Sequence, residues 1–229
     1  MNTNSNSYTI IYASIVVIIV AFLLAFVSSS LKDKQQANVR IDTQKQILSA
    51  INERDVKDVE AQFKNVIKDM LMTENGDLVE YDGEFQTSYK NQKADNQYHV
   101  FVATLENGEK KFIIPIYGAG LWGPIWGYVA LNDDKATVYG AFFSHEGETP
   151  GLGAEIANPK FQDQFHEKKV MDNGKIALSV VKHGTVENAD YQVDGISGGT
   201  ITSKGVNDML HNCMKDYVPF LTNKTMEEN

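Results

Sequence analysis

The stretch YHVFVATLENGEKKFIIPIY, residues 98–117, decides the fold class of this chain. It contains two runs rich in β-branched and aromatic residues, 98–105 and 110–117, which are separated by Glu-Asn-Gly-Glu. Asn-Gly between two such runs is the strongest short-range signal for a β-hairpin. A second pair of β-rich runs, 126–131 and 136–144, follows and turns at Asn-Asp-Asp. Two consecutive hairpins predict a largely antiparallel sheet.

Helical signals flank these hairpins. Residues 55–71 place apolar side chains at three- and four-residue spacing, which predicts a helix with one buried face. Asn-Pro at 158–159 predicts the start of a short helix that runs to about residue 169, and residues 203–221 predict the last helix. Residues 176–182 predict one more strand. Hairpins with helices beside them, in place of alternating strands and helices, predict an α+β domain with a mainly antiparallel sheet flanked by helices.

The composition excludes several classes of protein. The 229 residues include 21 Lys and Arg against 30 Asp and Glu, so the formal charge is 21 − 30 = −9. This acidic balance, without basic tracts, argues against nucleic-acid binding. The one Cys, Cys213, cannot form an internal disulfide, nor by itself hold an iron–sulfur cluster or a zinc ion. It falls in the apolar stripe of the last predicted helix, where we expect a buried and inert thiol.

An apolar segment at residues 8–27 contains no charged residue. About 20 such residues match the ~30 Å hydrocarbon layer of a bilayer. The residues before it include no Lys or Arg, and no clean small-x-small cleavage site follows it, so we predict a retained single-pass anchor and not a cleaved signal peptide. We therefore divide the chain into a tail and transmembrane helix at 1–31, a helical stalk at 32–54 and a globular domain at 55–229.

The charges beside the span do not settle which side of the membrane the domain occupies. Lys32, Lys34 and Arg40 follow the span, whereas no basic residue precedes it. The positive-inside rule would then favour a cytoplasmic domain. The rule weakens when a large domain follows the span, because long segments are translocated largely regardless of charge.

Three glycine-bearing loops contain residues that turn formation alone does not explain. The first, GAGLWGPIWG at 118–127, holds both tryptophans, which either pack in the core or form a wall against a flat aromatic cofactor. The second, HEGETPGLG at 145–153, contains a Pro-Gly pair typical of a type II turn, which leaves Glu148 and Thr149 free to bind other groups. The third, DGISGGTITS at 194–203, precedes the last predicted helix, so it favours either a simple helix cap or a phosphate site.

Other chemistries fit these loops less well. The spacing in the third loop matches neither GxGxxG nor GxxxxGK[ST], which argues against a dinucleotide or ATP site. His145 with Glu146 and Glu148 lacks a second His at ligand spacing, so we predict no metal site. A hydrolase that uses His145 with Ser197 or Thr200 would lack the G-x-S-x-G elbow. A membrane-tethered binding domain, in which the loops form an interface and hold no cofactor, remains open.

The third loop resembles a known motif. DGISGGT at 194–200 is similar to the flavinylation motif D-x-x-[ST]-G-A-T of the FMN-binding domain family, which includes NqrC of Na⁺-translocating NADH:quinone oxidoreductases and RnfG of Rnf complexes. ETPGLG at 148–153 resembles the second signature of that family, and GLWG at 120–123 resembles one typical of its quinone oxidoreductase members. Gly199 departs from the motif, which usually has Ala there. The three motifs behind one anchor extend the resemblance over essentially the whole chain.

The resemblance implies FMN attached covalently to Thr200 by a phosphoester, with no catalytic residue in the chain itself. The phosphate would lie near the start of the last helix, and Lys182 is the better candidate for its counter-charge, ahead of Lys204. Leu121, Trp122 and Leu152 would form the walls of the flavin site, with Glu148 and Thr149 at the ring edge. The predicted cofactor-binding residues are thus Thr200, Ser197, Gly198, Gly199, Ile201, Thr202, Lys182, Glu148, Thr149, Leu152, Leu121 and Trp122.

The resemblance further implies an electron-carrying subunit of a Na⁺-translocating NADH:quinone oxidoreductase in a bacterial inner membrane. The RnfG component of an Rnf complex, or another extracytoplasmic flavinylated electron-transfer protein or reductase, is the alternative. The implied partners are the other subunits of the complex, the membrane, and a flavin transferase that attaches FMN from FAD. In this family the globular domain lies on the periplasmic side, in conflict with the charge count around the span.

Overall fold

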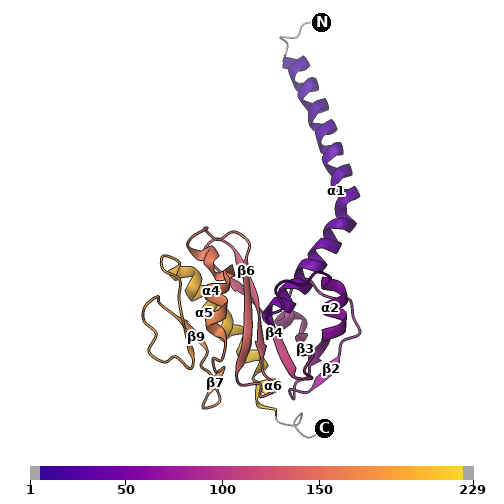
Figure 1. Ribbon diagram of the computed structural model, residues 1–229. Helices are drawn as coiled ribbons and strands as arrows, with labels where there is room; N and C mark the ends of the chain where they lie inside the picture. Colours follow the sequence, from indigo (N-terminus) through magenta and orange to yellow (C-terminus); the bar gives the residue numbers. More distant parts are fainter. Residues whose placement is uncertain (1–5, 224–229) are drawn as a thin grey trace. The chain divides into compact units, whose positions relative to one another are not determined.

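The computed structural model describes residues 6–223 and divides the chain into two compact units, Met1–Ile41 and Asp42–Asn229. Parts of the predicted segments 1–31 and 55–229 therefore lie outside the described residues, at 1–5 and 224–229. The first helix, α1, spans Asn6–Ala50 (Figure 1). Among the residues that the structure describes, it is the one helix long and apolar enough to cross a membrane, with a mean hydropathy of 3.1 over its most apolar 18 residues. Such a helix is compatible with a single-pass membrane anchor.

The second unit includes the C-terminal end of α1. Ile47 and Leu48 have no exposed surface, and they pack with residues of the globular sheet. The unit therefore begins within the segment that the sequence assigned to a stalk, because these apolar side chains find a core there.

A six-stranded sheet forms the centre of the second unit, in the order β2-β1-β3-β4-β5-β6, and every neighbouring pair is antiparallel. Both predicted hairpins are confirmed, as β3–β4 and β5–β6. The strands are β1 (Ile67–Met72), β2 (Leu78–Glu80), β3 (Tyr98–Thr104), β4 (Lys110–Ala119), β5 (Pro124–Leu131) and β6 (Val138–His145).

The sheet is buried on both faces, because apolar residues alternate between two cores along the central strands. In β4, Ile114 and Ile116 pack in one core, whereas Ile113 between them packs in the other. The first core contains helix α5 (Thr200–Met214), and the second contains the end of α1 and helix α2 (Val59–Val66). Figure 1 shows α5 and α2 on opposite sides of the sheet. The predicted α+β class, with an antiparallel sheet flanked by helices, is confirmed.

The helix predicted over 55–71 is wrong at both ends, since α2 begins only at Val59 and residues from Ile67 onward form a strand. Helix α2 ends at Val66, and the chain then enters β1, which pairs with both β2 and β3. A short apolar run satisfies helical spacing and a partly buried strand equally well. The tertiary environment decides here, since pairing with β3 provides hydrogen bonds for the backbone of residues 67–72.

The C-terminal half follows its predicted order with shorter elements. Asn158 caps α4 (Pro159–Gln162) by accepting a hydrogen bond from the amide of Lys160, as predicted, but the α-helix ends before residue 169. The predicted strand 176–182 is divided into β8 (Lys175–Ile176) and β9 (Ser179–Val181). The predicted last helix starts earlier, at Thr200, and is interrupted before its end. The remaining elements are α3 (Gln92–Asp95), η1 (Gly153–Ala157), η2 (Asp163–Phe165), β7 (Met171–Asp172), β10 (Gln192–Asp194), η3 (Lys215–Tyr217) and α6 (Val218–Thr222).

Helix α5 lies unusually close to the end of β4. A Cβ added at Gly205 would come within 2.4 Å of the carbonyl oxygen of Ala119, and one at Gly118 within 2.7 Å of the Met209 Cβ. These two glycines therefore permit the close packing of the helix on the strand. The packing brings the first turn of α5 beside the loop that follows β4. Cys213, near the other end of α5, is half-buried against Tyr117, and burial raises the pKa of its thiol, as expected of an inert cysteine.

Candidate functional site

The three glycine-bearing loops meet at one carboxylate. Glu148 Oε1 accepts a hydrogen bond of 2.8 Å from the backbone amide of Trp122, in the hairpin tip between β4 and β5. Its Oε2 accepts a hydrogen bond of 2.5 Å from the hydroxyl of Thr202, in the first turn of α5. The amide of Leu121 also donates to this carboxylate. One buried side chain, 5% exposed, thus joins segments that lie 26 and 54 residues away in the sequence.

Two glycines provide the space for this carboxylate. A Cβ at Gly120 would lie 2.5 Å from Glu148 Oε1, and one at Gly153 would lie 2.4 Å from Oε2 and 2.3 Å from Thr202 Oγ1. Neither position has room for a side chain while the carboxylate and hydroxyl keep their places. These glycines therefore serve the packing around Glu148 and not a special backbone conformation.

The carboxylate of Glu148 is stabilised in its charged form. Burial acts to raise its pKa, but hydrogen bonds from Thr202, Trp122 and Leu121, together with nearby His145, outweigh burial and hold the pKa below its usual value. His145 Nδ1 lies 3.2 Å from the backbone amide of Glu148 and accepts its hydrogen bond. The site therefore includes a fixed negative charge at neutral pH.

The second loop folds as the predicted type II turn. The amide of Leu152 donates to the carbonyl of Thr149, at 3.1 Å, and Gly151 has a positive φ of 75° at the third position. This turn leaves the side chains of Thr149 and Leu152 exposed. Leu152 projects on the same side as the third loop, since a Cβ added at Gly198 would lie 2.6 Å from its Cδ2.

The third loop is a second tight turn that leads directly into α5. The Gly199 amide donates to the Ile196 carbonyl at 3.0 Å, and Gly198 has a φ of +76°. Ser203 holds the loop from inside the helix, because its hydroxyl accepts a hydrogen bond from the Ile196 amide at 2.9 Å. The sequence DGISGG is thus folded back onto the first turn of α5.

Thr200 is the first residue of α5 and is exposed, with Gly199 at the N-cap position. Among the described residues, no side chain caps this end of the helix. The simple helix cap that the sequence left open is not formed by Thr202 or Ser203, since both side chains are buried and bonded to other groups. Free amides at the start of a 15-residue helix favour an anion, through their hydrogen bonds and the helix dipole.

Asp194 and His183 form a close polar contact that the sequence did not predict. β10 runs parallel to β9, and this pairing sets Asp194 opposite Val181. Asp194 Oδ2 lies 2.8 Å from His183 Nδ1, and its Oδ1 accepts a hydrogen bond from the Gly184 amide at 2.7 Å. The first residue of the DGISGGT segment therefore fixes the loop to the end of β9. The two residues are 11 positions apart in sequence, and only the parallel pairing brings them together.

Lys182 directly follows β9 and so lies beside the start of the third loop. Val181 precedes Lys182 in the sequence, and its carbonyl accepts a hydrogen bond of 3.0 Å from the backbone amide of Gly195. The Lys182 side chain is exposed, and it enters none of the salt bridges found within residues 6–223. Lys204, by contrast, pairs with Asp208 on the same helix. Of the two lysines, Lys182 is therefore the one without an ion pair in the described part of the chain, and its backbone adjoins the third loop.

Exposed apolar side chains concentrate in the three loops and the first turn of α5. Six large hydrophobic residues are exposed in the described part of the globular unit, and four of them belong to the three loops or the first turn of α5. Apolar side chains clustered beside free backbone amides are typical of a surface that binds a ligand with an apolar ring and an anionic group. The four are Leu121 (47% exposed), Trp122 (69%), Leu152 (42%) and Ile201 (57%).

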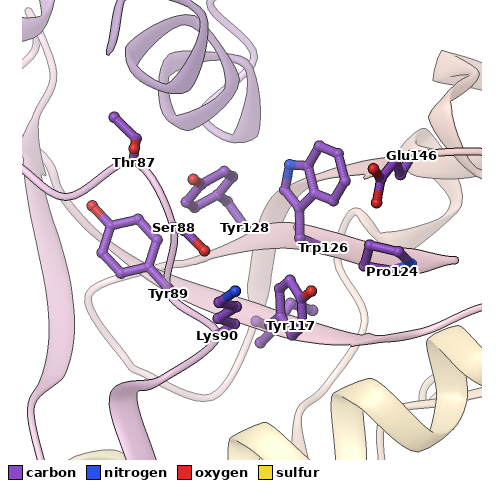
Figure 2. A pocket seen from close by; sticks show the side chains of 11 residues that line it. Thr87, Ser88, Tyr89, Lys90, Tyr117, Pro124, Trp126, Tyr128 and Glu146 are labelled. Atoms are coloured by element: carbon purple, nitrogen blue, oxygen red, sulfur yellow. The ribbon is translucent and has the colours of Figure 1, made fainter. Parts of the chain in front are cut away.

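The two tryptophans of the first loop have different environments. Trp122 is largely exposed at the hairpin tip, whereas Trp126 is half-buried and its indole nitrogen donates to Gln46 Oε1 at 2.9 Å. Trp126 also lines a separate cavity of about 360 Å³, shown in Figure 2 with the rings of Tyr89 and Tyr128. None of the residues predicted to bind the cofactor lines this cavity.

The arrangement therefore fits the phosphate and ring of FMN at one place. Thr200, the uncapped start of α5 and Lys182 suit the phosphate, and Leu121, Trp122 and Leu152 suit the ring. Residues 120–215 match the family described as FMN-binding domain, so the class of the protein is that of chains with an FMN-binding domain.

Comparisons with known proteins narrow this class. The chain is 32% identical to the NqrC protein of the Na(+)-translocating NADH-quinone reductase from Vibrio campbellii, over 89% of each chain. A crystal structure of the same protein from Parabacteroides distasonis matches with a TM-score of 0.76 and 46% identity, over 85% of this chain and 98% of that one. The structure of Shewanella oneidensis NqrC matches with a TM-score of 0.67 and 26% identity, over 81% and 98%. The chain belongs to the NqrC family, a subunit family of the Na⁺-translocating NADH-quinone reductase.

Proposed function

We propose that Thr200 holds FMN through a phosphoester bond and that the chain relays electrons through this flavin within the membrane complex. The observation that carries the proposal is the position of Thr200. Its side chain is exposed at the first residue of an uncapped helix, in a segment that matches the flavinylation motif except at Gly199. The exposed patch of Leu121, Trp122, Leu152 and Ile201 beside it supports a large apolar ring as the ligand.

Attachment requires a second substrate and a transferase. The Thr200 hydroxyl oxygen would form the bond to the FMN phosphorus of FAD as the bond from that phosphorus to the AMP phosphate breaks, so that AMP would leave and the hydroxyl proton would pass to solvent. The phosphodiester that results carries one negative charge, which the first-turn amides of α5 and the ammonium of Lys182 would stabilise.

The residues around Thr200 divide the remaining work. Leu121, Trp122 and Leu152 would exclude water from one side of the ring, and Thr149 would bond its polar edge. Ser197, Gly198, Gly199, Ile201 and Thr202 shape the backbone at the phosphate. Bound FMN would supply the electron transfer, while the protein determines its position and exposure.

We also propose that the globular unit lies on the periplasmic side of a bacterial inner membrane, with the other subunits of the complex as its partners. The apolar first helix supports a single-pass anchor, and membership of the NqrC family supports the complex. Protease treatment tests the orientation. The globular unit should be cleaved in spheroplasts and protected in inverted vesicles, and the reverse pattern would contradict the proposal.

Intact-protein mass spectrometry tests the attachment. The full chain, produced with a flavin transferase, should gain the mass of one FMN less one water, and Thr200→Ala should abolish the gain. Thr200→Ser and Ser197→Ala are matched variants, because each keeps a hydroxyl at position 200, and both should retain the adduct. An adduct that persists in Thr200→Ala would disprove the assignment.

A further inference from the structure

We propose that Glu148 is a positioning residue that holds the β4–β5 hairpin tip against the first turn of α5. In this role it does not contact the flavin ring. The inference deepens the proposed function, since it explains how the apolar wall and the attachment residue keep one relative geometry. It concerns the chain's own contacts, so it also has a test without flavin.

The position of the carboxylate supports this role. Glu148 is 5% exposed, and each of its oxygens already accepts a hydrogen bond, from the Trp122 amide and from the Thr202 hydroxyl. Little of its surface remains for a ligand. The three chain segments that it joins are the same three that the flavin site requires.

The direction of the hydrogen bonds determines how the hairpin tip presents its side chains. The amides of Leu121 and Trp122 point inward to the carboxylate, while their side chains are 47% and 69% exposed. A tip without this acceptor would leave two amides free to turn towards water, and the apolar side chains would lose their fixed orientation. The outward presentation of the wall therefore depends on a buried anion beneath it.

Thr202 completes the link on the helix side. It lies two residues after Thr200, and its hydroxyl is buried against Glu148 Oε2. The Thr202 hydroxyl and Glu148 Oε2 lie together in the space that a Cβ of residue 153 would fill, so a shift of Thr202 would move the carboxylate and, through it, the hairpin tip. The β4–β5 hairpin tip and the first turn of α5, which contains Thr200, should therefore move together.

Hydrogen exchange in a flavin-free background tests this coupling. In the full chain with Thr200→Ala, we expect Thr202→Val to accelerate amide exchange at Leu121 and Trp122 by about tenfold, as loss of a charge-assisted hydrogen bond implies. Val keeps the shape of Thr but removes the donor. Thr202 does not contact these amides, so a purely local role for its hydroxyl predicts no change at the tip, and that result would overturn the proposal.

Substitutions at position 148 and a matched control sharpen the test. Glu148→Ala should accelerate exchange at the tip more than Glu148→Gln, because the Gln amide can still accept from the tip and donate to the Thr202 hydroxyl. Glu146→Gln, which removes an exposed charge two residues away, should leave the exchange unchanged. If Glu148→Ala does not fold, the Thr202→Val arm still decides. A Glu146→Gln variant that accelerates exchange at the tip as much as Glu148→Ala does would overturn the proposal.

The flavinylated protein gives a second readout. In the Thr202→Val molecules that carry FMN by mass, the flavin should show lower fluorescence anisotropy and altered visible circular dichroism, because the wall is no longer held against it. Wild-type spectra in a fully loaded Thr202→Val protein would overturn the positioning role. An unloaded wild-type chain would instead contradict covalent attachment, while the exchange experiment would still test the link.

Discussion

Trp122 and Trp126 lie four residues apart on one hairpin, yet they belong to different kinds of surface. Trp126 packs on the sheet face that the end of α1 covers, and its indole bonds Gln46. Trp122 is 69% exposed, and only its backbone amide is held, by Glu148. Other parts of the chain pack against Trp126, the tryptophan that stabilises the fold, and leave Trp122 exposed. An aromatic side chain that the chain leaves open, beside an uncapped helix, indicates a ligand surface.

The largest expected difference concerns folding stability. Trp126→Ala should lower the free energy of unfolding by about 3 kcal/mol, since it removes a packed ring and leaves Gln46 Oε1 without its donor. Trp122→Ala should change it by less than about 0.5 kcal/mol, as for most exposed positions. Denaturant unfolding of the full chain in detergent measures both. Similar losses for the two variants would show that Trp122 is structural and would break the comparison.

The fold was predictable where local signals and tertiary structure agree. Asn107-Gly108 and the alternating runs around it predict the β3–β4 hairpin because turn chemistry and strand pattern act over a few residues. Residues 67–72 were mispredicted, since their strand state depends on pairing with β3, about 30 residues away. The burial of residues 47 and 48 in the globular core was not predicted, because it depends on the sheet residues that pack against them.

The site was predictable in part. Thr200, Leu121, Trp122 and Leu152 were assigned from motifs, and the structure brings their three loops together. The predicted contact of Glu148 with the flavin edge stays untested, but its observed partners are Trp122, Leu121 and Thr202. Nothing in the sequence marks Thr202 as the donor to Glu148, because hydrogen bonds between residues 54 positions apart follow from the fold. His183 was missed for the same reason.

The second prediction contrasts two glycines of the same loop region. Gly153→Ala should destabilise the protein by about 1–3 kcal/mol, because its Cβ would collide with Glu148 and Thr202. Gly147→Ala is the matched control, since an added Cβ at Gly147 meets nothing within 4 Å. The melting temperature and the fraction of chains that carry FMN by mass should both fall for Gly153→Ala. Both should stay unchanged for Gly147→Ala. A stable, fully loaded Gly153→Ala protein would mean that the packing around Glu148 is loose.

A third prediction concerns pH, with a smaller effect. The pKa of Glu148 is lowered in the folded chain from 4.5, so its ionised form stabilises the fold above about that pH. This contribution is lost as the pH falls through the lowered folded-state pKa, when the carboxylate becomes protonated. Stability between pH 7 and pH 3 should therefore decrease less in Glu148→Gln than in wild type. Glu146→Gln should show the same dependence of stability on pH as wild type. A weaker dependence in Glu146→Gln would mean that the effect comes from the loss of any negative charge and not from Glu148.

The smallest effect is expected at Gly199, where this chain departs from the Ala of the family motif. A Cβ there would lie 3.0 Å from Ile196 Cγ2 and 3.2 Å from the Leu152 carbonyl oxygen. A small side-chain shift relieves the first contact, and a backbone adjustment of a few tenths of an ångström relieves the second. Its backbone φ of −103° is open to any residue. Gly199→Ala should thus cost less than about 1 kcal/mol, because Ala is a weaker N-cap than Gly, and it should keep full FMN loading. Loss of FMN loading in this variant would show that the third loop of this chain requires glycine at position 199. The exposed loops would then tolerate substitution less well than their exposure suggests.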